Sequence, residues 1–202
     1  IHTGTSIGLE YEKYLHQSQS KYQNIEIIYS SKYGNVMYLD GCFMLSERNQ
    51  NYYHDKCISL VPSSVKNVLI IGGGDYAIAS KLAIQRGIKS IQIVEIDIEV
   101  INISKRYFPN HFKLSERNIG KMSLIVQDGM HFIRKNTEKF DCIIIDSTDP
   151  VDSSKVLISK LFLRGCFKSL KSGGLLIQQS GSPLKDANHI IGCLLYTSDA
   201  AD

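Results

Sequence analysis

Short apolar runs alternate with amphipathic stretches over most of the chain. Each run has the length of a buried strand and consists mainly of Ile, Leu and Val, whereas the intervening stretches place apolar residues at helical spacing. The predicted strands are Val68–Ile71, Ile91–Val94, Leu124–Val126, Cys142–Ile145 and Leu175–Gln178, and the predicted helices are Ala77–Arg86, Glu99–Tyr107, Met130–Asn136 and Lys160–Leu170. This alternation is typical of a parallel sheet with helical crossovers. We therefore expect an α/β domain with a Rossmann-like sheet over residues 51–192.

The pattern differs in the segment before residue 51. Ile25–Ser30 and Asn35–Leu45 show strand-like alternation, and Asp40-Gly41 lies between apolar flanks, which is a strong hairpin signal. We expect a small antiparallel β domain over residues 1–50, ahead of the Rossmann-like domain.

The two ends of the sequence stand apart from these patterns. The chain opens at Ile1 without an initiator Met, which indicates a fragment. The segment Cys193–Asp202 resembles the in-frame translation of a sequencing adapter. We expect residues 193–202 to be foreign to the protein and leave them out of the fold.

Composition excludes several classes of function. Of 202 residues, 43% are apolar and 21% are charged, and the net charge of +3 comes from scattered Lys and Arg residues. Such a surface predicts no nucleic-acid partner. No apolar run reaches the roughly 18 residues of a membrane span, so we expect a cytoplasmic protein without a membrane partner. The five cysteines lack the close pairing of a zinc site, which predicts reduced core thiols and no metal.

The segment Val68–Asp75 is the most informative motif. Here an apolar strand runs into Gly72, Gly73 and Gly74, which is typical of a nucleotide-binding turn, and Asp75 follows them directly. A carboxylate at this place repels a pyrophosphate and attracts an ammonium or sulfonium group. The motif therefore predicts a site for a cationic nucleoside.

Acidic and polar residues also follow the other predicted strands. They are Glu95 and Asp97, Asp128-Gly129, Asp146 with Asp149, and Gln178-Gln179. A single acid after a strand is more often a helix cap than a ligand group, but several on one edge of a sheet favour a polycationic ligand. Glu95 lies 21 residues after Gly74, the spacing at which a carboxylate binds ribose hydroxyls. The glycine turn and this acid alone fit either a dinucleotide or an adenosyl-sulfonium ligand.

These residues resemble the spermidine synthase family of aminopropyltransferases. The matching segments are Ser20–Gln23, Tyr33–Asn35, Leu39–Gly41, Glu47-Arg48, Tyr53-His54, Ile70–Asp75, Val94–Asp97, Asp128-Gly129, Phe140-Asp141 and Asp146–Pro150. The resemblance implies a fold like that of S-adenosylmethionine methyltransferases, with a homodimer built partly through the N-terminal domain. It also implies transfer of the 3-aminopropyl group of decarboxylated S-adenosylmethionine to putrescine, which gives spermidine and methylthioadenosine without a prosthetic group.

The resemblance also assigns roles to individual residues. The residues implied to hold the aminopropyl donor are Gln23, His54, Asp75, Glu95, Asp128 and Gly129. Tyr53, Asp146 and Asp149 are implied to line the diamine site, and Asp146 is the catalytic acid residue. The chemistry agrees, because an ammonium group must lose a proton before it can attack, and a carboxylate at a strand end can take that proton.

Two alternatives remain open from the sequence. One is an S-adenosylmethionine-dependent methyltransferase, and the other is a nucleoside-binding relative without catalytic activity. The second is suggested by two departures from the family pattern, Tyr76 in place of a glycine and Asp152-Ser153 in place of Gly-Pro. A longer polyamine is a further candidate acceptor. A ring at position 76 must point away from the glycine turn or crowd the donor.

Overall fold

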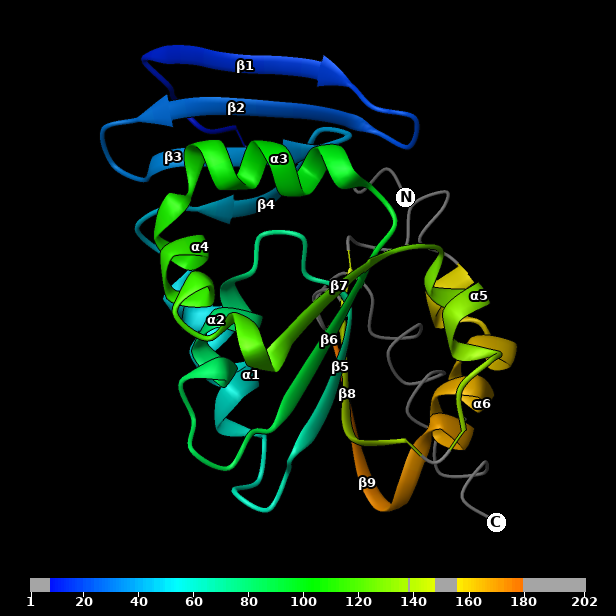
Figure 1. The fold of residues 1–202 in the computed structure, drawn as a ribbon. Coiled ribbons are helices and arrows are strands. Elements are labelled where there is room, and N and C mark those ends of the chain that lie inside the picture. Colours follow the sequence, from blue (N-terminus) through cyan, green and yellow to red (C-terminus); the bar gives the residue numbers. More distant parts are fainter. Residues whose placement is uncertain (1–7, 138, 148–155, 180–202) are drawn as a thin grey trace. The chain divides into compact units, whose positions relative to one another are not determined.

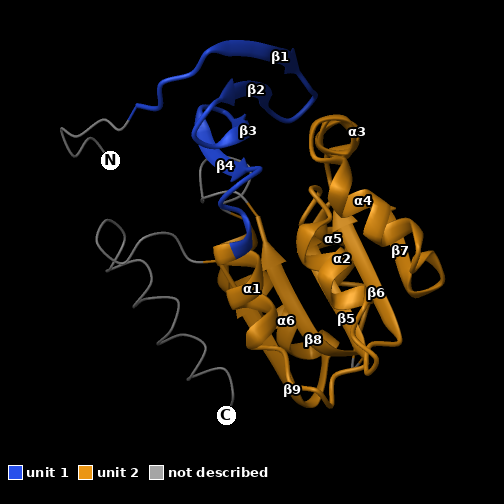
Figure 2. Cartoon of the chain, turned by 90° about the vertical axis from the view of Figure 1, so that its left-hand side faces the viewer, with its two compact units in different colours: residues 1–51 blue, residues 52–202 orange. Residues whose placement is uncertain are grey.

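The chain forms two compact units, residues 1–51 and 52–202 (Figure 2). The computed structural model describes residues 8–137, 139–147 and 156–179. Among the described residues, no helix combines the length and apolar character needed to cross a membrane.

The first unit is a four-stranded antiparallel sheet in sequence order. Its strands are β1 (Lys13–Gln19), β2 (Asn24–Ser30), β3 (Gly34–Leu39) and β4 (Cys42–Ser46). Leu39 pairs with Cys42, so Asp40 and Gly41 alone form the turn, and both have positive φ (49° and 75°). A two-residue turn with this geometry matches the twist of the strands, and the predicted hairpin is confirmed. Strand β1 was not predicted, because its sequence is mostly polar.

The second unit contains a five-stranded parallel sheet with the order β7-β6-β5-β8-β9. The strands are β5 (Asn67–Gly72), β6 (Ser90–Glu95), β7 (Met122–Val126), β8 (Phe140–Asp146) and β9 (Leu170–Gln178). All five predicted strands are present, and the predicted fold class is confirmed. The order reverses between β5 and β8, which is the place where open α/β sheets bind ligands.

Helices cover both faces of this sheet (Figure 1). They are α1 (Asn51–Ser59), α2 (Ala77–Ala83), α3 (Ile98–Tyr107), α4 (Pro109–Glu116), α5 (Gly129–Ile133) and α6 (Lys160–Ser169), with a short 3-10 helix, η1, at Ile119–Lys121. The predicted helices agree with α2, α3, α5 and α6, although α2 and α5 end three residues before their predicted ends. Neither α1 nor α4 was predicted, and both prove to lie next to the candidate site.

The central strand β5 is buried on both sides. Val68 and Ile70 belong to one apolar cluster, which includes residues of α1 and α2. Leu69 and Ile71 belong to a second cluster, which includes residues of α5 and α6. A strand between two layers of helices needs apolar side chains in both directions, which explains its unbroken apolar run.

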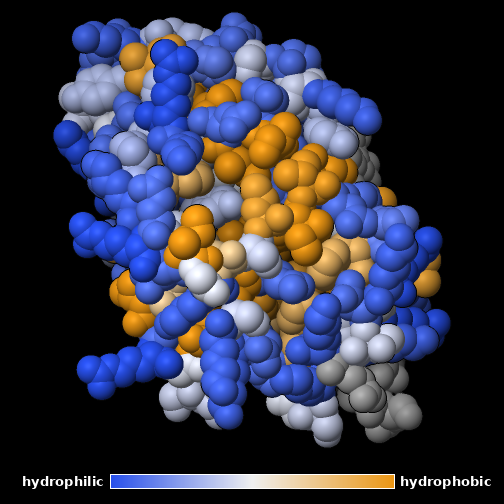
Figure 3. Space-filling view, viewed as in Figure 1, coloured by the Kyte–Doolittle hydropathy of each residue, from blue (hydrophilic) through white to orange (hydrophobic). Residues whose placement is uncertain are grey.

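Hydrophilic side chains cover most of the face drawn in Figure 3, with apolar side chains exposed between them. Two exposed apolar residues, Leu124 and Val126, lie on β7 at the edge of the sheet.

Candidate active site

The carboxyl ends of β5 and β8 meet at Gly72 and Asp146, which are paired in the sheet. The backbone N–H of Gly73 donates a hydrogen bond of 2.9 Å to the carbonyl of Asp146. Gly72 has a φ of 84°, and a Cβ at this position would lie 2.1 Å from the same carbonyl oxygen. Only glycine fits here, so the turn is held directly against the end of β8.

The next glycine of the turn approaches a second acid. A Cβ on Gly74 would lie 3.0 Å from Oε2 of Glu95, and one on Gly73 would lie 3.4 Å from Oδ2 of Asp146. The glycines therefore bring the backbone close to two carboxylates. This arrangement differs from a phosphate-binding loop, in which glycines allow the backbone to approach an anionic ligand.

Asp146 is the most strongly perturbed acid of this edge. The Tyr53 hydroxyl donates a hydrogen bond of 2.8 Å to its Oδ1. Burial, and then the charges of Asp75 and Glu95, raise the pKa of Asp146 to about 7, although the bond from Tyr53 opposes the rise. Burial and the charge of Asp146 also raise the pKa of Tyr53, so its hydroxyl keeps its proton at neutral pH. The structure thus brings together two of the predicted site residues.

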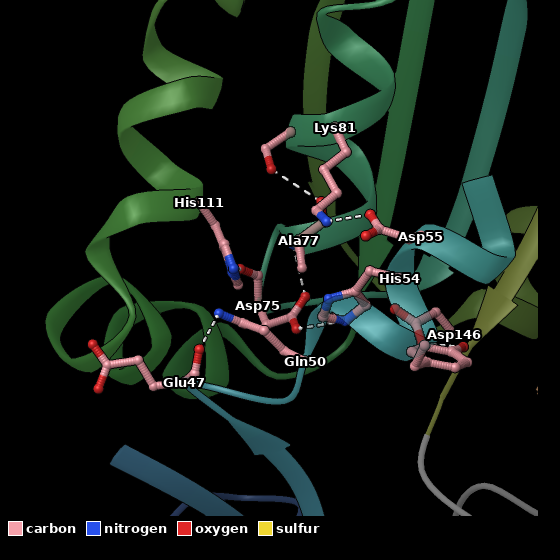
Figure 4. A network of polar contacts seen from close by, with 11 residues as sticks. Glu47, Gln50, His54, Asp55, Asp75, Ala77, Lys81, His111 and Asp146 are labelled. Carbon is pink, nitrogen blue, oxygen red and sulfur yellow. Dashed lines mark hydrogen bonds and ion pairs between the residues drawn. The ribbon is translucent and has the colours of Figure 1, made fainter. Parts of the chain in front are cut away.

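Helix α1 supplies Tyr53 and the adjacent His54. Cys57 fixes this helix in the core, and Asp55 forms an ion pair with Lys81 of α2 (Figure 4). Helices α1 and α2 therefore hold the Tyr53 hydroxyl and the His54 ring beside the glycine turn.

His54 faces Asp75 at the end of that turn (Figure 4). Its Nε2 lies 3.5 Å from Oδ2 of Asp75, while Oδ1 of Asp75 accepts a hydrogen bond of 2.9 Å from the backbone N–H of Ala77. Burial lowers the pKa of His54, although the charge of Asp75 opposes this. His54 is therefore largely neutral at neutral pH. Its Nδ1 is buried without a hydrogen-bond partner among the described residues.

Glu95, at the end of β6, is buried. Burial raises its pKa to about 7, and the charge of Asp97 acts in the same direction, while backbone N–H groups of Asp97, Ile96 and Gly74 oppose it. The backbone N–H of Asp97 donates a hydrogen bond of 2.9 Å to Oε1 of Glu95. A carboxylate in this position, next to the turn, could accept hydrogen bonds from ribose hydroxyls.

Two of the strand-end acids act as helix caps. The Asp97 side chain accepts a hydrogen bond from Glu99 N at the start of α3, and Asp128 accepts one of 2.7 Å from His131 N at the start of α5. Asp97 is buried in this role, whereas Asp128 stays exposed. The interpretation of these acids as one cationic-ligand site therefore applies best to Asp75, Glu95 and Asp146.

Of the three remaining predicted site residues, the structure describes Gly129 and Gln23 but not Asp149. Gly129 begins α5, and a Cβ there would lie 2.7 Å from Cγ2 of Ile71. Gln23 lies in the first unit, between β1 and β2, and its N–H donates to the hydroxyl of Ser20. Asp149 lies outside the described residues, as do Asp152-Ser153 and the segment 193–202. The donor and diamine roles of these residues stay predictions.

Sequence reasoning missed His111, in the first turn of α4. Its Nδ1 lies 3.1 Å from the carbonyl oxygen of Asp75, and its ring meets that of His54 edge to face, with the centroids 6.1 Å apart. The sequence carried no signal for it, because α4 follows no predicted strand. Within the described part of the chain, no group of three or more His, Cys, Asp and Glu residues could hold a metal ion.

Comparison with known families covers both units. Residues 50–201 match the model of the spermine/spermidine synthase domain, and residues 1–47 match that of the spermidine synthase tetramerisation domain. The chain belongs to the spermidine synthase, or polyamine aminopropyltransferase, family. The resemblance found in the sequence is confirmed, and the second match favours an oligomer.

Individual relatives agree with this family. The chain is 38% identical to a polyamine aminopropyltransferase of Alkaliphilus metalliredigens over 88% of its own length and 63% of that protein. It is 39% identical to the Thioalkalivibrio sulfidiphilus protein over 95% of its length and 68% of that protein. The chain thus spans about two thirds of the length of these curated relatives.

Solved structures of the family have the same fold. One is a spermidine synthase in complex with the transition-state analogue AdoDATO, with a TM-score of 0.88 and 28% identity. Another is spermidine synthase from Thermotoga maritima, with a TM-score of 0.85 and 28% identity. Each likeness covers 98% of this chain, and 69% and 68% of the two solved chains.

Proposed function

We propose that the protein transfers the 3-aminopropyl group of decarboxylated S-adenosylmethionine to putrescine, which yields spermidine and methylthioadenosine. The observation that best supports this is the group of three carboxylates around the glycine turn, in which burial, and then the charges of Asp75 and Glu95, raise the pKa of Asp146. Such a group favours a ligand with positive charges at several points. A sulfonium nucleoside and a diamine together supply these charges.

Asp146 has the properties of the base in this reaction. The attacking amine nitrogen forms a bond to the carbon next to the sulfonium, the carbon–sulfur bond breaks, and its electron pair goes to sulfur. The amine proton passes to Asp146, whose raised pKa suits a general base near neutral pH. The hydrogen bond from Tyr53 fixes the orientation of the carboxylate.

Asp75 and Glu95 suit recognition of the donor. Oδ2 of Asp75 faces His54 and is placed to attract the ammonium group of the aminopropyl chain. The carboxylate of complete S-adenosylmethionine would be repelled by the same group, which favours the decarboxylated form. We assign Glu95 to the ribose, and retain donor roles for Gln23, Asp128 and Gly129 and a diamine role for Asp149.

Ligand-induced stabilisation tests this proposal on the chain itself. Decarboxylated and complete S-adenosylmethionine are compared by thermal shift at equal concentrations, since a ligand that binds only the native state raises its stability by RT ln(1 + [L]/Kd). A larger shift with the decarboxylated form, together with release of methylthioadenosine when putrescine is added, is expected.

Two other outcomes would contradict the proposal. A larger shift with complete S-adenosylmethionine, and release of S-adenosylhomocysteine, would identify a methyltransferase. Binding of the decarboxylated donor without methylthioadenosine release, with putrescine or with a longer polyamine, would identify a relative without catalytic activity. Asp146→Asn is the matched variant, because it keeps the shape of the side chain and lacks the base. It should bind the donor and release no product.

A further inference from the structure

The turn that carries Asp75 ends in an unusual backbone conformation. Tyr76 has φ 64° and ψ 6°, and its N–H donates a hydrogen bond of 2.9 Å to the carbonyl of Gly73. A non-glycine residue costs on the order of 1–2 kcal/mol in this left-handed region. The turn therefore needs contacts outside itself to keep this shape.

Helix α4 provides one such contact. The ring of Tyr76 stacks on that of Phe112, with centroids 4.6 Å apart and an angle of 27° between the planes. Such a pair contributes about 0.5–1.5 kcal/mol beyond the area it buries, which is similar to the cost of the backbone conformation. The ring thus lies against α4.

The residue before Phe112 provides a second contact. Nδ1 of His111 lies 3.1 Å from the carbonyl oxygen of Asp75. A carbonyl oxygen only accepts, so Nδ1 of His111 must carry the proton in this hydrogen bond. The bond fixes the peptide plane between Asp75 and Tyr76. His111 is buried and also meets the ring of His54, the residue that faces the Asp75 carboxylate (Figure 4).

We propose that His111 is a positioning residue for Asp75, and that the adjacent Phe112 supports the same turn through Tyr76. In this arrangement α4 fixes the carboxylate that recognises the ammonium group of the donor. His111 acts through the Asp75 backbone and the His54 ring. The inference rests on the proposed function, because it assigns donor recognition to Asp75.

Two ligands separate this role from a general effect on folding. Decarboxylated S-adenosylmethionine carries the aminopropyl ammonium, whereas methylthioadenosine lacks it. His111→Leu removes the hydrogen-bond donor at similar size, and loss of about 1.4 kcal/mol would weaken the decarboxylated donor roughly tenfold. Binding of methylthioadenosine should change less than about twofold. His111→Asn places an amide N–H near the position of Nδ1, and should restore most of the donor affinity.

Leu114→Ala is the control for loss of packing in the same helix, because Leu114 is half-buried and lies two residues after Phe112. It should lower the melting temperature without separating the two ligands. Equal weakening of both ligands by His111→Leu, or no weakening of either, would overturn the inference. If the wild-type chain does not prefer decarboxylated to complete S-adenosylmethionine, the proposed function itself fails.

Two further measurements keep the inference testable if His111→Leu does not fold. Nitrogen-15 NMR of the wild-type imidazoles should show that Nδ1 of His111 carries a proton. A neutral His111 ring with its proton on Nε2 would contradict the inference. Tyr76→Gly permits the same backbone conformation without the stack, so it should weaken the decarboxylated donor selectively, whereas Tyr76→Phe should not. Equal donor affinity in these two variants would exclude the supporting role of Phe112.

Discussion

Asp146→Asn should stabilise the protein without ligand, although it removes the proposed catalytic base. In the wild type, the carboxylate lies beside Asp75 and Glu95, and burial raises its pKa from 3.8 to about 7. Asn has the same shape, and its amide oxygen can accept the hydrogen bond from Tyr53. The substitution therefore removes a repelled charge and leaves the contacts of the side chain in place.

The expected size of the effect follows from the pKa difference. Because the folded-state pKa is above that of the unfolded chain, Asp146 keeps its proton longer in the folded state, and wild-type stability falls as pH rises from about 4 to about 7. Each pKa unit corresponds to about 1.4 kcal/mol, so the full difference amounts to about 4 kcal/mol. Since Asp146 is partly exposed and water screens its charge, we expect about 2 kcal/mol.

Urea denaturation followed by circular dichroism measures this difference, since the chain has no Trp for fluorescence. Wild type and Asp146→Asn should have similar unfolding free energies at about pH 4, and the variant should be more stable by about 2 kcal/mol at about pH 8. Asp128→Asn is the control, because Asp128 is exposed and Asn also caps helices well. A variant that is no more stable than wild type at about pH 8 would refute the electrostatic argument.

Three other perturbations test neighbouring parts of the structure. Gly72→Ala should lower the unfolding free energy in urea by about 3 kcal/mol, because its Cβ would meet the Asp146 carbonyl and its φ is positive. Asp141→Ala should cost about 1–3 kcal/mol at neutral pH, since Asp141 accepts hydrogen bonds from the Lys171 ammonium and from the backbone N–H groups of Asn67 and Lys66. Although burial acts to raise the pKa of Asp141, these bonds lower it, so their contribution disappears at acid pH. Affinity for putrescine, measured calorimetrically, should rise from about pH 5 to about pH 7 and then level off, because a cation favours ionised Asp146; an unchanged affinity would contradict this.

The sequence was sufficient to predict the sheet and the glycine turn, because both depend on local patterns. Runs such as Val68–Ile71 show burial on both sides directly, and Asp40-Gly41 sets the two-residue hairpin. Helix α4 was not predictable in the same way, since it is short and follows α3 without an intervening strand. His111 was missed for this reason, although it contacts the turn that the sequence had singled out.

The meaning of the glycines also changed between sequence and structure. The sequence predicted a turn whose backbone approaches a nucleoside ligand. In the structure, a Cβ on Gly72 would meet the Asp146 carbonyl, one on Gly73 would meet Ile70, and one on Gly74 would meet Glu95 and Val100. A sequence pattern shows that a position needs a small residue, but not which neighbour requires it, because that neighbour lies on another strand.

These contacts connect the fold of the turn to the selection of its ligand. Glycines that allow a close approach to Asp146 and Glu95 place the carboxylates near enough for their charges to repel, which costs stability while the ligand is absent. A cationic ligand removes that repulsion when it binds, so the same free energy favours cations over anions at this site. A phosphate-binding turn with similar glycines offers only backbone N–H groups and prefers the opposite charge. Under the proposed function, the acids around the turn, more than the glycines, therefore decide which class of nucleoside this site would select.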